Sequence, residues 1–281
     1  MPRILSIQNF SFRYPGAQRL AVDSFDLEVD RSEIIILAGP SGCGKSTLLR
    51  SINGLIPHMY SGDYSGAVLM DGANVREESM RALAQKVGFL FQNPENQIFM
   101  FSVERDVAFG LENLGVPREE MRRRVDEAMA QLGITHLARR APHELSDGQK
   151  QRVALAGVLA MQPGLVILDE PTSLLDPMTA SELVELVDKI RRENGTTFIV
   201  VEHRLDLLVR IADRLVVMNS GKKVLDGSCW DVLTDERAEG YGLSVPAIVK
   251  LEKGLNYHDV GTSARIPTAA QLAEEVNSRT A

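Results

Sequence analysis

GPSGCGKST, residues 39–47, decides the fold. It matches G-x-x-x-x-G-K-[ST], a pattern in which the backbone N–H groups of a glycine-rich loop surround the phosphates of a nucleotide. The apolar run EIIILA precedes it at 33–38, and STLLRSINGL at 46–55 has the composition of a helix. Because strand, loop and helix are the context that the motif requires, the sequence predicts an α/β fold with a nucleotide site, rather than a glycine-rich turn with an incidental lysine.

The residues of this loop have distinct expected roles. Its glycines let backbone amides close around the phosphates, Lys45 is expected to reach the β- and γ-phosphates, and the Ser46 hydroxyl is expected to bind Mg²⁺. The expected nucleotide contacts are Gly39, Pro40, Ser41, Gly42, Cys43, Gly44, Lys45, Ser46 and Thr47. Two interpretations of Cys43 stay open: a thiol whose pKa the helix N-terminus and Lys45 lower, or, as we favour, a small residue that fills space.

Two further apolar runs end in residues that can act on a phosphate. GLVILDEPTS at 164–173 contains Asp169 and Glu170, and TTFIVVEH at 196–203 ends at His203. At the carboxyl ends of strands, Asp169 is expected to bind Mg²⁺, Glu170 to orient or deprotonate the attacking water, and His203 to contact the γ-phosphate or that water. Solvated acids and a structural histidine are the alternatives, and the loop at 39–47 weighs against the first.

A second helix start follows later in the chain, at HELSDGQKQR, residues 143–152. Ser146 can cap the helix, Gly148 keeps the backbone bare, and Gln149 opens a polar–apolar pattern. Since free N–H groups at a helix start form an anion site, the chain has two candidate phosphate contacts.

Composition limits the classes of function. The chain has 281 residues, 44% hydrophobic and 25% charged, which suits a globular protein with a sizeable core. Its formal net charge of -7 argues against nucleic acid as a partner. Cys43 and Cys229 are too few for a disulfide framework, which suits a reducing cytoplasm. No signal peptide is expected, and VALAGVLAMQPGLVIL at 153–168 is interpreted as a buried helix end followed by a strand rather than a membrane span.

Six motifs follow one another in the order GPSGCGKST, FQNP with Gln92, LSDGQ, LVILDE, SLLD with Asp176, and VEH with His203. In this order they resemble the ATPase subunit of ABC transporters, over roughly residues 5–227. The resemblance implies a P-loop NTPase fold with a RecA-like core, an antiparallel β subdomain and a helical signature subdomain at about 93–160. It also implies an ABC ATPase domain over 1–227 and a C-terminal extension over 228–281, a candidate dimerisation segment.

The same resemblance assigns roles to individual residues. ATP and Mg²⁺ are the implied ligands, and two subunits face each other head to tail, so that the signature loop of each covers the ATP of the other. The signature residues here are Ser146, Asp147, Gly148 and Gln149. Gln92 would contact Mg²⁺ and the attacking water, Glu170 would be the general base, His203 would hold the γ-phosphate, and Asp176 would communicate across the dimer. Tyr14 would stack on adenine, although the alternation of IQNFSFRY also permits it to face a core.

One residue departs from the family pattern. The usual signature is L-S-G-G-Q, and Asp147 replaces its first glycine. A carboxylate beside a triphosphate is unfavourable unless it points away or pairs with a cation such as Lys150 or Arg152. Asp147 is therefore expected to weaken ATP binding at the site that this loop completes.

Periodicity organises the rest of the chain. Residues 1 to about 92 are expected to form strands around the phosphate loop, including SGAVLMDG at 65–72. PREEMRRRVDEAMAQLG at 117–133 predicts an amphipathic helix with a mixed-charge solvated face, and LVVMNSGKKVLDG at 215–227 predicts a hairpin turning at 219–221. The apolar positions expected on one face of that helix are Met121, Val125, Ala128 and Leu132.

Three stretches resemble, more narrowly, the ATPases of energy-coupling factor importers, which bring vitamins or cobalt and nickel ions into prokaryotic cells. They are INGLIPHMYSGDYSG at 52–66, NPENQIFMFSVERDVAFGLENLGVP at 93–117, and YGLSVPAIVKLEKGL at 241–255. In that group the segment after the glutamine lies at a groove for the coupling helices of a membrane subunit. The apolar run 98–101, followed by Glu104 and Asp106, suits a basic amphipathic helix, or else fills the subdomain's own core.

The implied function is thus ATP hydrolysis that powers such an importer, by a peripheral protein on the cytoplasmic face of the cell membrane. The implied partners are a second ATPase subunit, either a copy or a paralogue, a transmembrane coupling subunit and a membrane substrate-binding subunit, without nucleic acid. A conventional importer with an extracellular binding protein is the nearest alternative. An ABC ATPase acting on DNA would carry a long coiled coil, and one acting on ribosomes would carry two cassettes.

Overall fold

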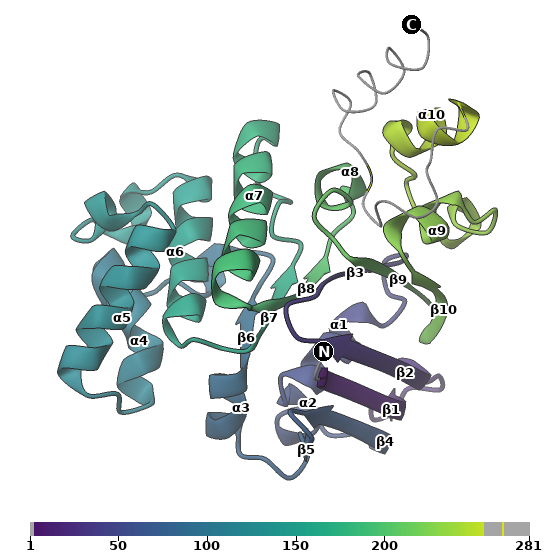
Figure 1. Cartoon of the computed structure of the whole chain (residues 1–281). Helices are drawn as coiled ribbons and strands as arrows, with labels where there is room; N and C mark the ends of the chain where they lie inside the picture. Colours follow the sequence, from purple (N-terminus) through teal and green to yellow (C-terminus); the bar gives the residue numbers. More distant parts are fainter. Residues whose placement is uncertain (1–2, 256–265, 267–281) are drawn as a thin grey trace, which may run out of the picture.

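The computed structural model describes residues 3–255 and 266. Its centre is a six-stranded sheet in the order β10-β9-β3-β8-β7-β6 (Figure 1). Neighbours from β9 to β6 run parallel, and β10 pairs antiparallel with β9. The strands are β3 (Ile34–Ala38), β6 (Val87–Leu90), β7 (Leu165–Asp169), β8 (Thr197–Val201), β9 (Arg214–Asn219) and β10 (Lys222–Gly227).

A second, antiparallel sheet has the order β2-β1-β4-β5. Its strands are β1 (Arg3–Arg13), β2 (Val22–Asp30), β4 (Asp63–Met70) and β5 (Ala73–Asn74). In Figure 1 it lies below the main sheet, on the side of α1 (Lys45–Ile52). Next to it are α2 (Leu55–His58) and α3 (Met80–Lys86), two short helices that the expectation of strands up to residue 92 missed.

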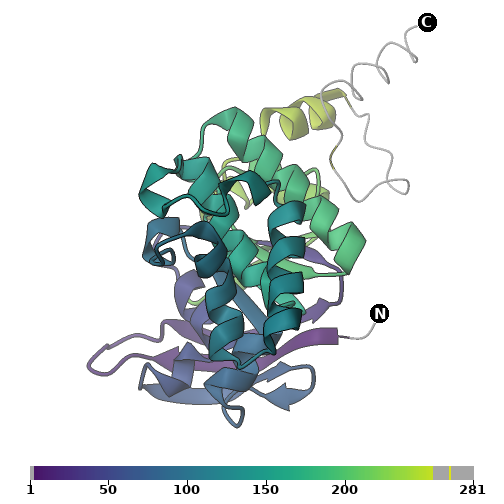
Figure 2. The same ribbon diagram turned by 90° about the vertical axis from the view of Figure 1, so that its left-hand side faces the viewer.

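Helices cover the other side. The group of α4 (Val103–Asn113), α5 (Arg118–Gln131) and α6 (Asp147–Ala160) forms the lobe on the left of Figure 1 and faces the viewer in Figure 2. The 3-10 turn η1 (Pro94–Asn96) connects β6 to α4, and η2 (Thr135–Leu137) and η3 (Pro142–Glu144) lie between α5 and α6. The remaining helices are α7 (Pro177–Asn194), α8 (Leu205–Leu208), α9 (Cys229–Thr234) and α10 (Ala247–Leu255), with η4 (Glu239–Tyr241).

Both faces of the main sheet are buried, as a parallel sheet requires. Along β3, Ile34 and Ile36 point into a core shared with α4 to α7, whereas Ile35 and Leu37 point into a second core shared with α1 and the antiparallel sheet. The strand before the phosphate loop is apolar at every position because each of its two faces packs into a different core. The predicted α/β fold with an antiparallel subdomain and helices is confirmed.

Several local predictions are also confirmed. Val125, Ala128 and Leu132 of the predicted amphipathic helix are buried, and Met121 packs against them partly buried. The hairpin forms from β9 and β10, and Ser220 and Gly221 at its turn both have positive φ. None of the helices in the described part of the chain combines the length and apolar character that a membrane crossing needs.

The first part of the C-terminal segment packs on the core. Val232 of α9, Val249 of α10 and Leu243 between the two helices are buried, and Ile266 joins the same cluster. The rest of the predicted C-terminal extension, residues 256–265 and 267–281, lies outside the described residues.

Candidate nucleotide site

The glycine-rich loop closes tightly between β3 and α1. Gly39 and Gly44 have φ of 141° and 112°, in the region that favours glycine. A Cβ on Gly39 would lie 2.0 Å from the carbonyl oxygen of Met218, and one on Gly44 would lie 2.2 Å from that of Ala21. Gly44 precedes α1 and carries no side chain that could cap it. The first-turn N–H groups of α1 can therefore meet an anion.

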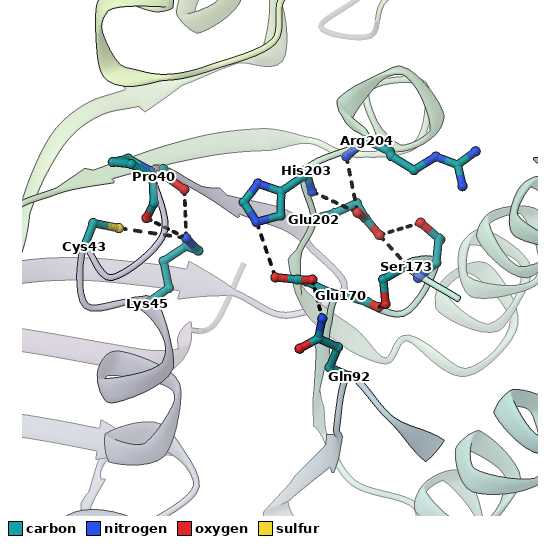
Figure 3. Close-up of polar contacts among 11 residues, drawn as sticks. Pro40, Cys43, Lys45, Gln92, Glu170, Ser173, Glu202, His203 and Arg204 are labelled. Atoms are coloured by element: carbon teal, nitrogen blue, oxygen red, sulfur yellow. Dashed lines mark hydrogen bonds and ion pairs between the residues drawn. The ribbon is translucent and has the colours of Figure 1, made fainter. Parts of the chain in front are cut away.

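Lys45 folds over its own loop. Its ammonium donates hydrogen bonds to the carbonyl oxygens of Gly39 (2.7 Å) and Pro40 (3.0 Å), as Figure 3 shows. The side chain is buried at 8% exposure, so the charge is held close to the backbone cradle. Ser46, the next residue, is exposed, and Thr47 is buried.

Cys43 is a small buried residue, 5% exposed. Burial raises the pKa of its thiol, and the positive charge of Lys45 offsets this only in part. The interpretation of Cys43 as a thiol with a lowered pKa is wrong, because desolvation of the thiolate outweighs the neighbouring cation.

Three sequence-predicted residues meet at the ends of adjacent strands. Gln92 follows β6, Glu170 follows β7, and His203 follows β8. The Gln92 amide donates to Glu170 Oε2 (2.8 Å), and His203 Nε2 lies 3.3 Å from Glu170 Oε1 (Figure 3). Parallel strands bring these side chains together because their carboxyl ends share one edge of the sheet.

Asp169 is the last residue of β7. Burial and the neighbouring charge of Glu170 raise the pKa of its carboxyl, while Lys45 and Arg50 lower it. The net effect raises the pKa of Asp169, so a cation bound beside its carboxylate would stabilise the ionised form. The donor set of carboxylates, an amide and the Ser46 hydroxyl suits Mg²⁺, which prefers oxygen ligands.

Glu202 is a buried polar residue that sequence reasoning missed. It is 3% exposed, lies between β8 and His203, and accepts hydrogen bonds from Thr172, His203 and Arg204. The available signal was a carboxylate placed directly after the four apolar residues FIVV, at the end of a strand buried along its length. A buried acid at that position needs donors, which the sequence does not name.

Tyr14 lies beside α1, partly buried. Its hydroxyl is 3.2 Å from Thr47 Oγ1 and accepts from Arg50 (3.3 Å). Its ring packs edge-on against Phe12, with 4.9 Å between the centroids. Core packing is thus present, and stacking on adenine stays a prediction.

The signature residues begin α6, as predicted. The Ser146 hydroxyl accepts from the N–H of Gln149 (3.4 Å), and the Gln149 side chain accepts from the N–H of Ser146 (3.0 Å). Asp147 has a side chain 65% exposed, 3.9 Å from Lys150, which makes its closer contact with Glu95. Arg152 pairs instead with Glu182 (2.7 Å). Of the two cations that could pair with Asp147, the expectation for Arg152 is therefore wrong.

The signature residues share a cavity of about 540 Å³ with the start of α7. Asp176 lies there and caps α7, accepting from the N–H groups of Met178 (3.0 Å) and Thr179 (3.1 Å). These bonds, with that of the Thr179 hydroxyl, lower the pKa of Asp176. All lining residues in the described part of the chain fall between Gly133 and Glu182, so the phosphate loop is not among them.

A second groove of about 410 Å³ lies beside the segment after Gln92, lined among others by Phe89, Phe91, Phe99 and Phe109. Phe99 is 60% exposed, and the neighbouring Phe101, 87% exposed, also faces solvent. Asp106, in contrast, is buried, and its carboxylate accepts hydrogen bonds from the N–H groups of Phe99 (2.9 Å) and Met100 (3.0 Å). The expectation that Asp106 faces a partner is wrong, because it holds this loop.

Comparison with known proteins adds a family. The family model described as ABC transporter matches residues 22–173. The energy-coupling factor transporter ATP-binding protein of Symbiobacterium thermophilum is 42% identical over 258 residues, covering 91% of this chain and 88% of that protein. A putative ABC transporter ATP-binding protein of Methanosarcina acetivorans is 40% identical over 259 residues, covering 92% of this chain. This chain spans only 42% of the length of that archaeal relative.

A solved structure is similar along almost the whole chain. It is CbiO1 of Clostridium perfringens, described as part of the ABC transporter complex CbiONQ. The TM-score is 0.77 at 35% sequence identity, and the match covers 90% of this chain and 100% of CbiO1.

Proposed function

Since the chain belongs to the ABC transporter ATP-binding family, whose members hydrolyse ATP, we propose that it is the ATPase of an energy-coupling factor type importer. We propose vitamins or the transition-metal ions cobalt and nickel as the imported substrates, and the cytoplasmic face of the cell membrane as the location. Similarity to the Symbiobacterium protein and to CbiO1 supports this choice. The observation that carries the ATPase assignment is the meeting of Gln92, Glu170 and His203 at one edge of the sheet.

The chain's own residues account for binding and hydrolysis. The loop backbone and the first-turn N–H groups of α1 surround the phosphates, and Lys45 moves its ammonium from the loop carbonyls to the β- and γ-phosphates. Glu170 takes the proton of the attacking water as general base. Gln92 and His203 hold its carboxylate on either side, and His203 contacts the γ-phosphate. Tyr14 stacks on adenine.

Ser46, Asp169 and Gln92 would hold Mg²⁺. When bound, the ion neutralises charge on the β- and γ-phosphate oxygens. Asp169 is suited to this because its carboxyl is partly buried beside a second acid, which a divalent cation relieves.

The signature residues act on a second nucleotide, held by a partner ATPase subunit that is a copy or a paralogue of this chain. Support comes from their cavity, which they share with Asp176 rather than with the phosphate loop. In the proposed dimer Asp176 communicates between the two sites. The segment 228–281 would add contacts between the subunits, and Leu251 on α10, 53% exposed, is available for them.

The groove after Gln92 would receive a coupling helix of the transmembrane subunit. Its exposed aromatic side chains, Phe91 and Phe99, offer an apolar surface, and Glu104 on the exposed side of α4 favours a basic helix. A membrane substrate-binding subunit would complete the importer. The chain's net charge of -7 agrees with the absence of nucleic acid among the proposed partners.

The test is a mild-detergent pull-down of the tagged chain from its native membranes, followed by mass identification of the captured proteins. Two small integral membrane proteins, one with basic coupling helices and one that binds a vitamin or metal ion, are expected. Capture with an extracellular binding protein's permease would indicate a conventional importer. Capture with ribosomes or DNA would contradict the transport role while leaving ATP hydrolysis intact.

A further inference from the structure

One buried carboxylate joins the two turns that carry the candidate catalytic side chains. Glu202 Oε2 accepts from the N–H (3.3 Å) and the hydroxyl (2.5 Å) of Thr172, in the turn after β7. Glu202 Oε1 accepts from the N–H groups of His203 (2.8 Å) and Arg204 (3.2 Å), in the turn after β8. Figure 3 shows Glu202 beside His203, with Glu170 below it. Each oxygen thus serves a different turn.

The turn after β7 needs such support. Glu170 has φ of 48°, in the left-handed region that non-glycine residues rarely adopt. Its N–H donates to the carbonyl of Val201 on β8 (2.8 Å), and its own carbonyl accepts from the Ser173 hydroxyl (2.9 Å). A backbone in this region persists only where several contacts fix it together. The bonds from Thr172 to Glu202 are a second attachment of the same turn to the β8 side.

We propose that Glu202 is a positioning residue for ATP hydrolysis, which fixes the Glu170 carboxylate relative to the His203 ring. This inference rests on the roles proposed above for those two residues. Among the described residues, the four donors to Glu202 are three backbone N–H groups and one hydroxyl, so the arrangement there depends on two acceptor oxygens rather than on an ion pair. An amide has a single acceptor oxygen and can serve only one of the turns.

The hydrogen bonds from the turn after β8 extend toward the cavity that the signature residues share with Asp176. The Arg204 guanidinium donates to the carbonyl of Leu175 (3.4 Å), one residue before Asp176. The turn after β8 is therefore tied to the segment 172–175 at both ends, through Glu202 and through Arg204. A displacement of this segment would reach Glu170 and His203 together.

Glu202→Gln tests the proposal, because it keeps the shape of the side chain and removes one acceptor. We expect kcat for ATP hydrolysis by the full chain to fall by about 10- to 100-fold, since a small misplacement of reacting groups costs rates of that order. KM for ATP should change by less than about threefold, because the phosphate loop is untouched. The matched control is Asp188→Asn on α7, another buried carboxylate, which holds Arg191 and Arg192 and should keep kcat.

Two measurements separate positioning from general loss of structure. In a His203→Ala background, Glu202→Gln should lower kcat by less than about twofold more, because residues that act as a unit are not additive. Full additivity, or an unchanged kcat in Glu202→Gln alone, would overturn the proposal. Thr172→Val, which removes one of the four donors, should give a smaller loss of the same kind.

A spectroscopic readout works without turnover. The ring signal of His203, one of five histidines, is assigned by NMR through its loss in His203→Ala. In the otherwise unchanged chain this signal should shift on Glu170→Gln, and in the Glu202→Gln background it should no longer respond. A response that persists in that background contradicts the inference.

The proposed catalytic roles are checked separately in the same series. If Glu170→Gln hydrolyses ATP as fast as the unchanged chain, the proposed roles fail. If Glu170→Gln is inactive and Glu202→Gln is fully active, the roles stand and only the inference on Glu202 fails.

Discussion

At the start of α1, Gly44 has no side chain that could cap the backbone N–H groups. At the start of α6, in contrast, two side chains accept hydrogen bonds from backbone N–H groups. Ser146 and Gln149 form a reciprocal capping box there. The first helix start leaves its donors to a ligand, and Lys45 adds a charge beside them. At the second, the N–H groups of Ser146 and Gln149 are bonded to side chains, and Asp147 adds an exposed acid.

A helix N-terminus alone therefore does not define a phosphate site. Around α1, the chain also supplies the acids, the amide and the histidine that we propose for hydrolysis, all from neighbouring strand ends. Around α6 it supplies a polar cavity that the phosphate loop does not line, which agrees with the proposal that this loop covers another subunit's nucleotide.

Glu170→Gln should have the largest effect, on the side that holds the chemistry. Removing a general base lowers kcat by about 100- to 10,000-fold. ATP binding should persist because the phosphate loop is intact, so closed dimers should accumulate with ATP, as measured by size-exclusion chromatography and ATPase assay. Turnover at the rate of the unchanged chain would show that Glu170 is not the base.

Lys45→Ala should remove binding itself. Loss of a buried ammonium that meets phosphate costs about 3 kcal/mol, or roughly 100-fold in ATP affinity. Isothermal titration with ATP measures this. Lys150→Ala, at the other helix start, is the matched control and should leave the affinity of the monomer for ATP unchanged; equal losses in both variants would erase the contrast between the helices.

Much of this site follows from the sequence because it depends on local backbone rules. The phosphate loop requires glycine where φ is positive, and residues after buried strands must share the sheet edge, so Asp169, Glu170 and His203 could be predicted. Side-chain direction and burial could not. The pKa of Cys43 depends on a core assembled from distant segments, and Glu202 has donors that only the fold brings within reach.

Asp147→Gly should strengthen the contact that the start of α6 makes with the partner's nucleotide. Removing a carboxylate that faces a partner's phosphates should tighten ATP-dependent dimerisation by about 3- to 10-fold, the scale of a repulsion of about 1 kcal/mol. Analytical ultracentrifugation with ATP measures this in the Glu170→Gln background, which prevents turnover. The control is Asp147→Asn, which removes the negative charge but keeps a side chain of nearly the same size at this position. Unchanged or weaker dimerisation in both variants would mean that Lys150 already neutralises Asp147.

Ser146→Ala has the smallest expected effect and the most informative control. Loss of the cap should cost about 1 kcal/mol of unfolding free energy, which lowers Tm by roughly 2–4 °C in a chain of this size. Ser79 and Ser228 cap α3 and α9 through the same kind of bond, 3.2 Å and 3.1 Å long. Their change to alanine should therefore cost similar stability. Only Ser146→Ala should also weaken ATP-dependent dimerisation, since only its hydroxyl would meet the partner's nucleotide. If all three variants dimerise alike, Ser146 serves only as a helix cap. The proposal that the start of α6 contacts the phosphates of the partner's nucleotide would then be wrong.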